Sequence, residues 1–194
     1  MRVLLHACCA PCSLKCVETL RQEDVAPVLF WYNPNIHPFT EYQNRMDALR
    51  AFAGDETLDV VWDKAAYGLR PFLAAVGQEL DARCEICYRT RMNATARYAS
   101  ENGFDGYSTT LLISPYQKHE RIRELAEQAS RIYGTPFIYR DFRPLFRAGQ
   151  QAARDRGLYR QKYCGCVFSE EERYSVDIAP QKDLGIHSLD LTEG

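Results

Sequence analysis

The chain has 194 residues, eight of them cysteine, and a formal net charge of -2. This length is enough for one domain with a substantial core, so stabilising disulfides are not required. The sequence has no apolar run of about 18 residues and begins with a strand-like stretch, so we expect a cytoplasmic protein with no membrane partner. In a reducing cytosol, eight cysteines favour metal or redox chemistry.

Short apolar runs alternate with helical periodicity along the chain. The apolar runs predict strands at residues 3–5, 26–32, 58–62, 104–112 and 136–140. The amphipathic patterns predict helices at residues 13–22, 40–53, 69–80, 85–102, 118–133 and 148–155. We place helix N-caps at Ser13 and at Thr40, the latter in a capping box with Gln43. The alternation predicts an α/β fold, with a mostly parallel sheet and helices on both faces.

The balance of basic and acidic residues changes near the end of the chain. We expect residues 1–174 to form a single α/β domain, and residues 175–194 to be a polar, acidic tail. The domain includes a basic, partly helical segment at 140–163, which carries seven basic residues against two acidic ones. A basic segment close to thiols predicts contact with nucleic acid phosphates, and a solvated basic face is the alternative.

The cysteines form three groups. Four of them follow the first predicted strand directly, in the stretch HACCAPCSLKC at 6–16. Because open α/β folds build their sites at the carboxyl ends of strands, these thiols are expected to face a cavity. The others form two pairs, CEIC at 84–87 and CGC at 164–166. Although cysteine is often a small buried packing residue, three groups far apart in the sequence suggest one site in space.

Several kinds of sulfur chemistry fit this inventory. Thiolate ligands select zinc or iron–sulfur clusters. A structural zinc site uses four cysteines and leaves the other four unexplained. A thioredoxin-like exchange site at Cys9 and Cys12 has the right spacing, but it leaves both distant pairs unused. An iron–sulfur cluster with spare thiolates beside it, for another metal or for the substrate, uses more of the sequence.

Six motifs, in this order, closely resemble those of the QueH-type epoxyqueuosine reductases: HACCAPCS, FWYNPNIHPFTEYQNR, RCEICYRTRM, STTLLISPYQ, YRDFRPLF and LYRQKYCGCVFS. The resemblance covers nearly everything from residue 3 to residue 169. It implies a HUP-like (Rossmann-like) fold with a cysteine-rich loop, at the carboxyl edge of the sheet, in place of a phosphate loop. It also implies an oxidoreductase that converts epoxyqueuosine to queuosine at the wobble position of tRNA without cobalamin, the last step of queuosine biosynthesis.

The resemblance further implies a 4Fe-4S cluster with an adjacent mononuclear iron. The family pattern requires seven of the cysteines as metal-site residues, which are Cys8, Cys9, Cys12, Cys84, Cys87, Cys164 and Cys166. Cys16 is extra to the pattern, so we interpret it as a packing residue of the first helix. An iron that binds an epoxide oxygen benefits from a hard oxygen ligand, and we assign that role to Asp141. A capping or arginine-paired aspartate is the alternative interpretation.

We expect catalytic roles for Cys9, Cys12 and Asp141, and for Tyr107 as a proton donor. Loop residues that follow predicted strands are candidates for binding the base and its cyclopentene hydroxyls, and these are Asn33, Asn35, Thr110, Ser114 and Gln117. Basic residues of the segment 140–163 are candidates for contact with the anticodon stem, in particular Arg143, Arg160 and Lys162. The expected partners are a tRNA with a GUN anticodon that carries epoxyqueuosine, and an external electron donor.

Two other functions remain open from the residues alone. One is a tRNA thiolase of the ATP-pyrophosphatase kind that carries a cluster, which needs a glycine- and serine-rich phosphate loop where this chain has Ala10-Pro11-Cys12. The other is a non-enzymatic, zinc-binding RNA module.

Overall fold

The computed structural model describes residues 1–63 and 67–175. Its four strands form one parallel sheet in the order β3-β2-β1-β4. The strands are β1 (Arg2–His6), β2 (Ala26–Trp31), β3 (Val60–Trp62) and β4 (Gly106–Thr109). This order is typical of the doubly wound arrangement, in which β2 and β3 are added on one side of the first strand and the next strand is added on its other side. The predicted Rossmann-like α/β fold is therefore confirmed.

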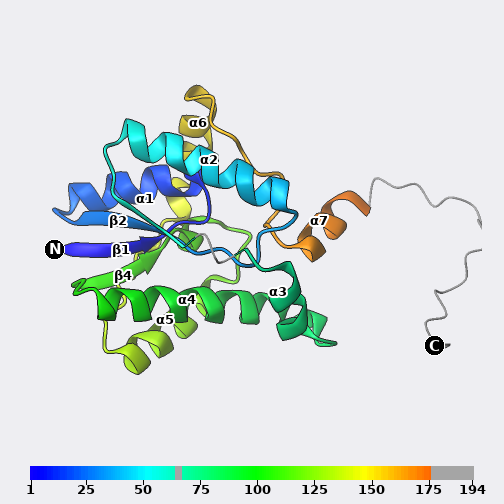
Figure 1. The fold of residues 1–194 in the computed structure, drawn as a ribbon. Coiled ribbons are helices and arrows are strands. Elements are labelled where there is room, and N and C mark those ends of the chain that lie inside the picture. The colour runs from blue at the N-terminus through cyan, green and yellow to red at the C-terminus, as the bar shows by residue number, and fades with distance from the viewer. Residues whose placement is uncertain (64–66, 176–194) are drawn as a thin grey trace, which may run out of the picture.

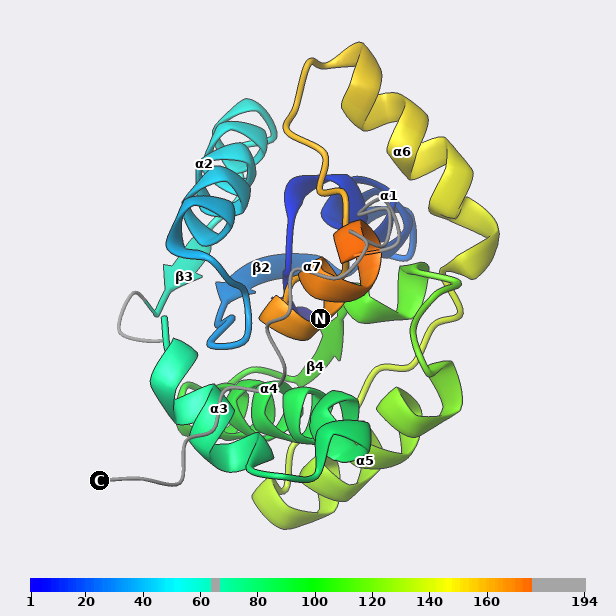
Figure 2. The same ribbon diagram turned by 90° about the vertical axis from the view of Figure 1, so that its right-hand side faces the viewer.

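The helices lie on both faces of the sheet and beyond its carboxyl edge (Figure 1; Figure 2). The α-helices are α1 (Ala10–Gln22), α2 (Phe39–Asp55), α3 (Leu69–Val76), α4 (Arg83–Glu101), α5 (His119–Tyr133), α6 (Phe146–Asp155) and α7 (Val167–Tyr174). Three short 3-10 helices are η2 (Leu80–Ala82), η3 (Thr110–Ile113) and η4 (Arg143–Leu145). Helices α1 and α2 cover one face, α4 and α5 cover the other, and α6 packs on α1.

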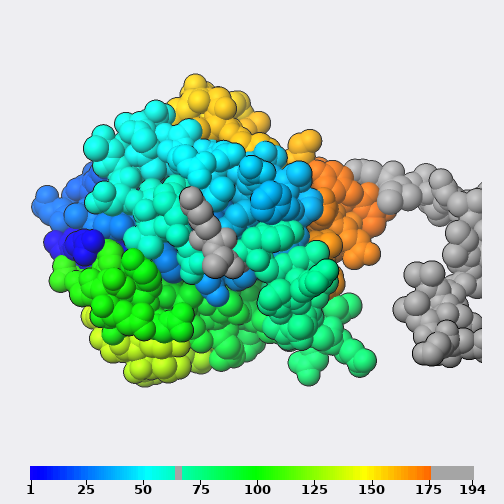
Figure 3. All heavy atoms as spheres, in the orientation of Figure 1, coloured from blue at the N-terminus to red at the C-terminus, as the bar shows by residue number. Residues whose placement is uncertain are grey.

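Helix α7 occupies the end of the molecule to which the strands point (Figure 1; Figure 3). Its Phe168 ring packs against Phe72 of α3, with ring centroids 6.3 Å apart. The site described below lies at this end, because the loops that follow parallel strands all emerge there. Strand β1 is central, and Val3, Leu4 and Leu5 are fully buried, as expected for a parallel strand covered on both faces. Among the described residues, no helix is long and apolar enough to cross a membrane.

Two predicted N-caps were wrong. Helix α1 begins at Ala10 with Cys9 as its N-cap, and Ser13 instead donates its hydroxyl to the Cys9 carbonyl at 2.8 Å. Proline suits the first turn of a helix because its φ is preset and its missing N–H is not needed there. Pro11 is therefore part of the first turn, and the helix begins earlier than predicted. The capping box at Thr40 does not form either, since α2 begins at Phe39 without a side-chain cap.

Two predicted strands are much shorter than expected, and the strand predicted at 58–62 begins later, at Val60. The strand predicted at 104–112 ends at Thr109, whose hydroxyl accepts a bond from the Leu111 N–H at 3.2 Å and starts η3. The strand predicted at 136–140 is reduced to a single bridge between Phe137 and Tyr107. Pro136 can accept a ladder bond but cannot donate one, so pairing does not extend in that direction. The short helix α7 was not predicted, and the predicted tail lies outside the described residues except for Ser175.

The contact between α6 and α1 depends on a glycine. A Cβ atom on Gly149 would lie 3.1 Å from the Pro11 carbonyl oxygen, a backbone atom of the first turn of α1. A Cβ atom on Gly54 of α2 would meet nothing within 4 Å. Both alanine replacements gain helix propensity, but only Gly149→Ala forces two helices apart.

We therefore expect Gly149→Ala to be less stable than Gly54→Ala by about 1–3 kcal/mol in free energy of unfolding. Urea denaturation of both variants beside the wild type measures this difference. Equal shifts in the two variants would contradict a tight crossing of α6 over α1.

Candidate metal and substrate site

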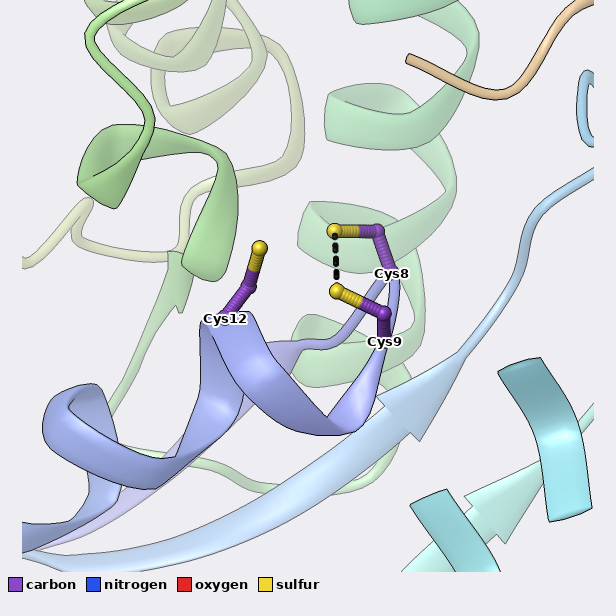
Figure 4. Close-up of side chains that lie close together, drawn as sticks. All are labelled: Cys8, Cys9 and Cys12. Carbon is purple, nitrogen blue, oxygen red and sulfur yellow. Dashed lines mark hydrogen bonds between the residues drawn. The ribbon is translucent and has the colours of Figure 1, made fainter. Parts of the chain in front are cut away.

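Cys8, Cys9 and Cys12 bring three thiols together where β1 ends (Figure 4). Their sulfur atoms lie within 4.8 Å of one another, and those of Cys8 and Cys9 are 3.8 Å apart. Extended backbone at Cys9 followed by the first turn of α1 brings the Cys12 sulfur back toward the other two. All three residues are buried. Three soft donors without a carboxylate or imidazole among them are a set that can bind a metal, and sulfur donors favour zinc or iron–sulfur clusters.

The three thiols differ in the direction in which their pKa is shifted. Hydrogen bonds from Cys12 and Cys9 hold the pKa of Cys8 well below its ordinary value. Burial raises the pKa of Cys9, and the hydrogen bond to Cys8 raises that of Cys12. A metal that takes all three sulfurs must therefore release the protons that the raised pKa values favour on Cys9 and Cys12.

A buried guanidinium faces the second cysteine group. Arg91 of α4 donates from Nη2 to the Cys87 sulfur at 2.6 Å and from Nε to the Cys87 carbonyl at 3.3 Å. Arg91 is 2% exposed, and within the described ranges 1–63 and 67–175 it forms no ion pair with a carboxylate. Burial nevertheless raises the pKa of Cys87 to about 12. A buried cation without a carboxylate partner is costly, so this environment fits metal-bound thiolates, which would supply negative charge.

The third cysteine group is held by α2. Arg45 donates to the Cys164 carbonyl and to the Tyr163 carbonyl, both at 2.9 Å, and its Nε donates to Glu41 at 2.6 Å. Gly165 has φ of +144°, and a Cβ atom there would lie 3.2 Å from the Arg45 guanidinium. The CGC turn is therefore shaped by a glycine that lies directly against the arginine that anchors it.

Side-chain amides connect the cysteine groups. Gln117 donates to the Cys164 sulfur at 3.1 Å, and Gln161 donates to the Cys9 sulfur at the same distance. The remaining two motif cysteines occupy the starts of helices: Cys84 is in the first turn of α4, and Cys166 is the N-cap of α7. An ion pair between Arg83 and Glu172 joins these two helices.

These groups surround a cavity of about 500 Å³, a size typical of small-molecule sites. Three thiols line it, from Cys8, Cys12 and Cys164. Its other lining residues are polar, basic or aromatic for the most part, and they include Thr110, Ser114, Tyr116, Gln117, Phe146, Gln150, Gln161, Lys162, Tyr163, Arg91 and Arg173. Among the residues with a described position, no aspartate or glutamate lines it. The cavity therefore suits an uncharged or anionic ligand.

Four of the predicted substrate residues line this cavity, namely Thr110, Ser114, Gln117 and Lys162. Asn33 and Asn35 do not, because both are buried in the loop after β2. Asn33 donates its amide to the Ala7 carbonyl at 3.0 Å and so supports the backbone just before the cysteines. Asn33 thus has a structural contact, and substrate contact by either asparagine stays a prediction.

Other predicted residues lie outside the cavity lining. The Tyr107 hydroxyl donates to the Ala126 carbonyl of α5 within the buried core. Asp141 accepts bonds from the Arg143 guanidinium at 2.6 and 2.8 Å, and this contact lowers the pKa of its carboxyl to about 2. Arg160 is exposed. The proposed roles of these four residues therefore stay predictions. Sequence reasoning missed the contacts of Arg45 and Gln161, although they lie within the motifs FWYNPNIHPFTEYQNR and LYRQKYCGCVFS, whereas Arg91 follows Cys87 by one helical turn in RCEICYRTRM.

We expect Arg91→Met to act oppositely on the metal-free and metal-bound protein. Without metal, the variant removes a buried cation that donates to a neutral Cys87 thiol and has no carboxylate partner among the described residues, so thermal stability is unchanged or higher. With metal, it removes the charge that offsets the thiolates, and metal affinity falls about 10–100-fold. Thermal denaturation and chelator competition measure the two effects.

Arg89→Met is the matched control, because Arg89 lies on the exposed face of the same helix and pairs with Glu85. An equal loss of stability in both forms of Arg91→Met would mean that Arg91 only packs against its neighbours.

Comparison with known proteins agrees with this architecture. Residues 3–172 match the family model described as epoxyqueuosine reductase QueH. A protein of that name from Dehalococcoides mccartyi is 36% identical over 179 residues, which cover 92% of this chain and 98% of the relative. One from Thermotoga maritima is 35% identical, with 88% and 91% covered. The chain therefore belongs to the epoxyqueuosine reductase QueH family.

Proposed function

We propose that this protein reduces epoxyqueuosine to queuosine at the wobble position of tRNA. Membership of the family over residues 3–172 supports this activity, because the relatives are named for it. The observation that carries the proposal is the cavity itself, which is lined by thiols from two distant segments and contains the buried Arg91 that contacts a third. The loop between β1 and α1 offers sulfur where a nucleotide-binding loop offers glycine backbone, and this disfavours an ATP-dependent thiolase.

The reaction requires electrons that amino acid side chains do not provide. Conversion of the epoxide to an alkene breaks both carbon–oxygen bonds, consumes two electrons and two protons, and releases water. A 4Fe-4S cluster and an adjacent mononuclear iron would supply one-electron transfer and Lewis acidity when bound. Four of the seven motif cysteines suffice for a cluster, which leaves three thiolates for the iron. Asp141 remains our proposed oxygen ligand, and it would have to leave Arg143 to serve.

Polar residues of the cavity would position either the modified base or the thiols. Ser114 accepts a bond from the Tyr116 N–H at 3.3 Å, and its own proton is available for a substrate hydroxyl. Gln117 accepts from the Tyr88 hydroxyl at 2.6 Å and donates to Cys164, so we infer that it orients this thiol rather than the base. The Thr110 hydroxyl oxygen lies 3.6 Å from the Cys8 sulfur, so we infer that Thr110 orients the Cys8 thiol.

The partner would be a tRNA with a GUN anticodon, and an external protein would donate the electrons. The basic segment leads directly into the cavity: Lys162 lines it and Arg160 is exposed beside it in sequence. Phosphate contacts by such residues give affinity that depends on salt, while a base taken out of the anticodon loop is recognised within a pocket. A cytoplasmic location stays a prediction.

We expect Cys84→Ala and Cys87→Ala each to lose the cluster and the activity together. Both residues lie in the first two turns of α4 at a spacing that puts their sulfurs on one face. Cys16→Ala is the control, since Cys16 is buried on α1 away from the cavity lining and its replacement only costs some packing. The measurements are iron and sulfide content after anaerobic reconstitution, absorbance near roughly 400 nm for a cluster, and turnover of an epoxyqueuosine stem–loop.

A colourless wild-type protein that retains zinc and has no turnover would disprove the proposed function. Full iron and sulfide content in both α4 variants would show that this pair does not hold the cluster.

We expect Arg160→Ala combined with Lys162→Ala to weaken tRNA binding and to reduce the slope of log affinity against log salt by roughly 1–2. Arg156→Ala is the matched control from the same segment, because Arg156 pairs with Glu56 at 2.7 Å and does not line the cavity. Filter binding over a range of salt concentrations measures the slopes. If the double variant keeps the wild-type slope, the segment is only a solvated basic face.

A further inference from the structure

An unusually exposed aromatic side chain stands at the mouth of the cavity. Tyr116 is 84% exposed, the largest value among the large apolar and aromatic side chains of the described residues, yet it lines the same cavity as Cys8 and Cys12. Tyrosine more often buries its ring and leaves only the hydroxyl in water. The proposed chemistry of the site does not use Tyr116, so its exposure calls for another explanation.

A backbone hydrogen bond and one ring contact orient Tyr116. The Tyr116 N–H donates to the Ser114 hydroxyl at 3.3 Å, and the next residue is fixed by the two side-chain bonds of Gln117. Phe146, the first residue of α6, meets the Tyr116 ring at 83° with centroids 5.7 Å apart. An edge-to-face contact of this kind orients a ring without covering both of its faces. Tyr116 therefore presents a preorganised flat surface to solvent.

The surroundings of Tyr116 indicate what covers it. Lys162 and Arg173 are exposed and line the same cavity. Across the part of the chain that the structure describes, neither forms an ion pair, and no carboxylate lines the cavity. A flat aromatic surface flanked by unpaired cations is the usual arrangement for single-stranded nucleic acid, in which bases stack on aromatic rings and phosphates meet the cations.

We propose that Tyr116, supported by Phe146, is the stacking platform for an unpaired nucleobase of the anticodon loop that neighbours the epoxyqueuosine. This inference rests on the proposed function, since it assumes that the modified base enters the cavity. Stacking a neighbouring base at the rim orients the loop while the modified nucleotide is held inside. The platform recognises the flat face that every base has, so it adds affinity and position rather than sequence specificity.

The test is binding of an anticodon stem–loop RNA that carries 2-aminopurine beside the wobble nucleotide, without any electron donor. We expect Tyr116→Ala to weaken binding roughly 5- to 150-fold and to lose the fluorescence quenching that stacking causes. Tyr116→Phe keeps the ring, so its affinity should stay within about 3-fold of the wild type, with quenching intact. Because tyrosine is uncharged, the salt slope of Tyr116→Ala should equal that of the wild type.

Ile132→Ala is the control for removing an exposed apolar side chain, since Ile132 is 68% exposed on α5 and does not line the cavity. Wild-type affinity and quenching in Tyr116→Ala would overturn the inference. A second result would also overturn it: Tyr116→Ala binds RNA normally and keeps turnover with dithionite, but loses turnover with a protein electron donor. The ring would then be a contact for the donor protein. A wild-type protein that binds and quenches the stem–loop without reducing epoxyqueuosine would instead disprove the proposed function.

Discussion

The position of the CGC cysteines depends on one buried guanidinium. Arg45 lies inside the protein at 1% exposure, and each of its nitrogens has a partner: Glu41, the Tyr163 carbonyl or the Cys164 carbonyl. Glu41 also accepts a bond from the Tyr159 hydroxyl, so the same pair fixes the chain before the turn. A buried ion pair adds little stability when replaced as a unit, but removing one partner leaves an unpaired charge. Lysine is a poor substitute because it lacks the planar fork that reaches both carbonyls.

Two buried arginines contact the cysteine groups. Arg45 extends from α2 and Arg91 from α4, helices that cover opposite faces of the sheet. Arg45 is balanced by a carboxylate, whereas Arg91 has sulfur as its partner. The cysteine cavity therefore carries an excess of positive charge that a set of bound thiolates offsets. Lys162 adds positive charge at the rim, which favours phosphate, so the same electrostatic bias would serve both the proposed metal and the proposed RNA contact.

Sequence reasoning succeeded where a property belongs to a short stretch. Alternating apolar runs predicted the parallel sheet, and the rule that sites follow strand ends placed the thiols of Cys8 and Cys12 in a cavity. It failed where a role depends on distant contacts. Gln161 contacts a sulfur 152 positions earlier, and Arg45 contacts a carbonyl 119 positions later, so neither contact follows from the neighbouring sequence. The Asn33 amide supports Ala7, a contact that its place in a loop does not indicate, and its contact with substrate stays a prediction.

The start of α1 carries thiols where nucleotide-binding α/β proteins bind a phosphate. In nucleotide-binding α/β proteins, the N–H groups and the dipole of the first helix face a phosphate. Here the corresponding N-terminus has no side-chain cap, Pro11 removes one N–H, and Cys8, Cys9 and Cys12 surround the first turn. The positive end of the dipole lowers the cost of negative charge on those sulfurs, as it does for phosphate. A helix start that favours anions thus suits a thiolate site without any change in the topology of the sheet.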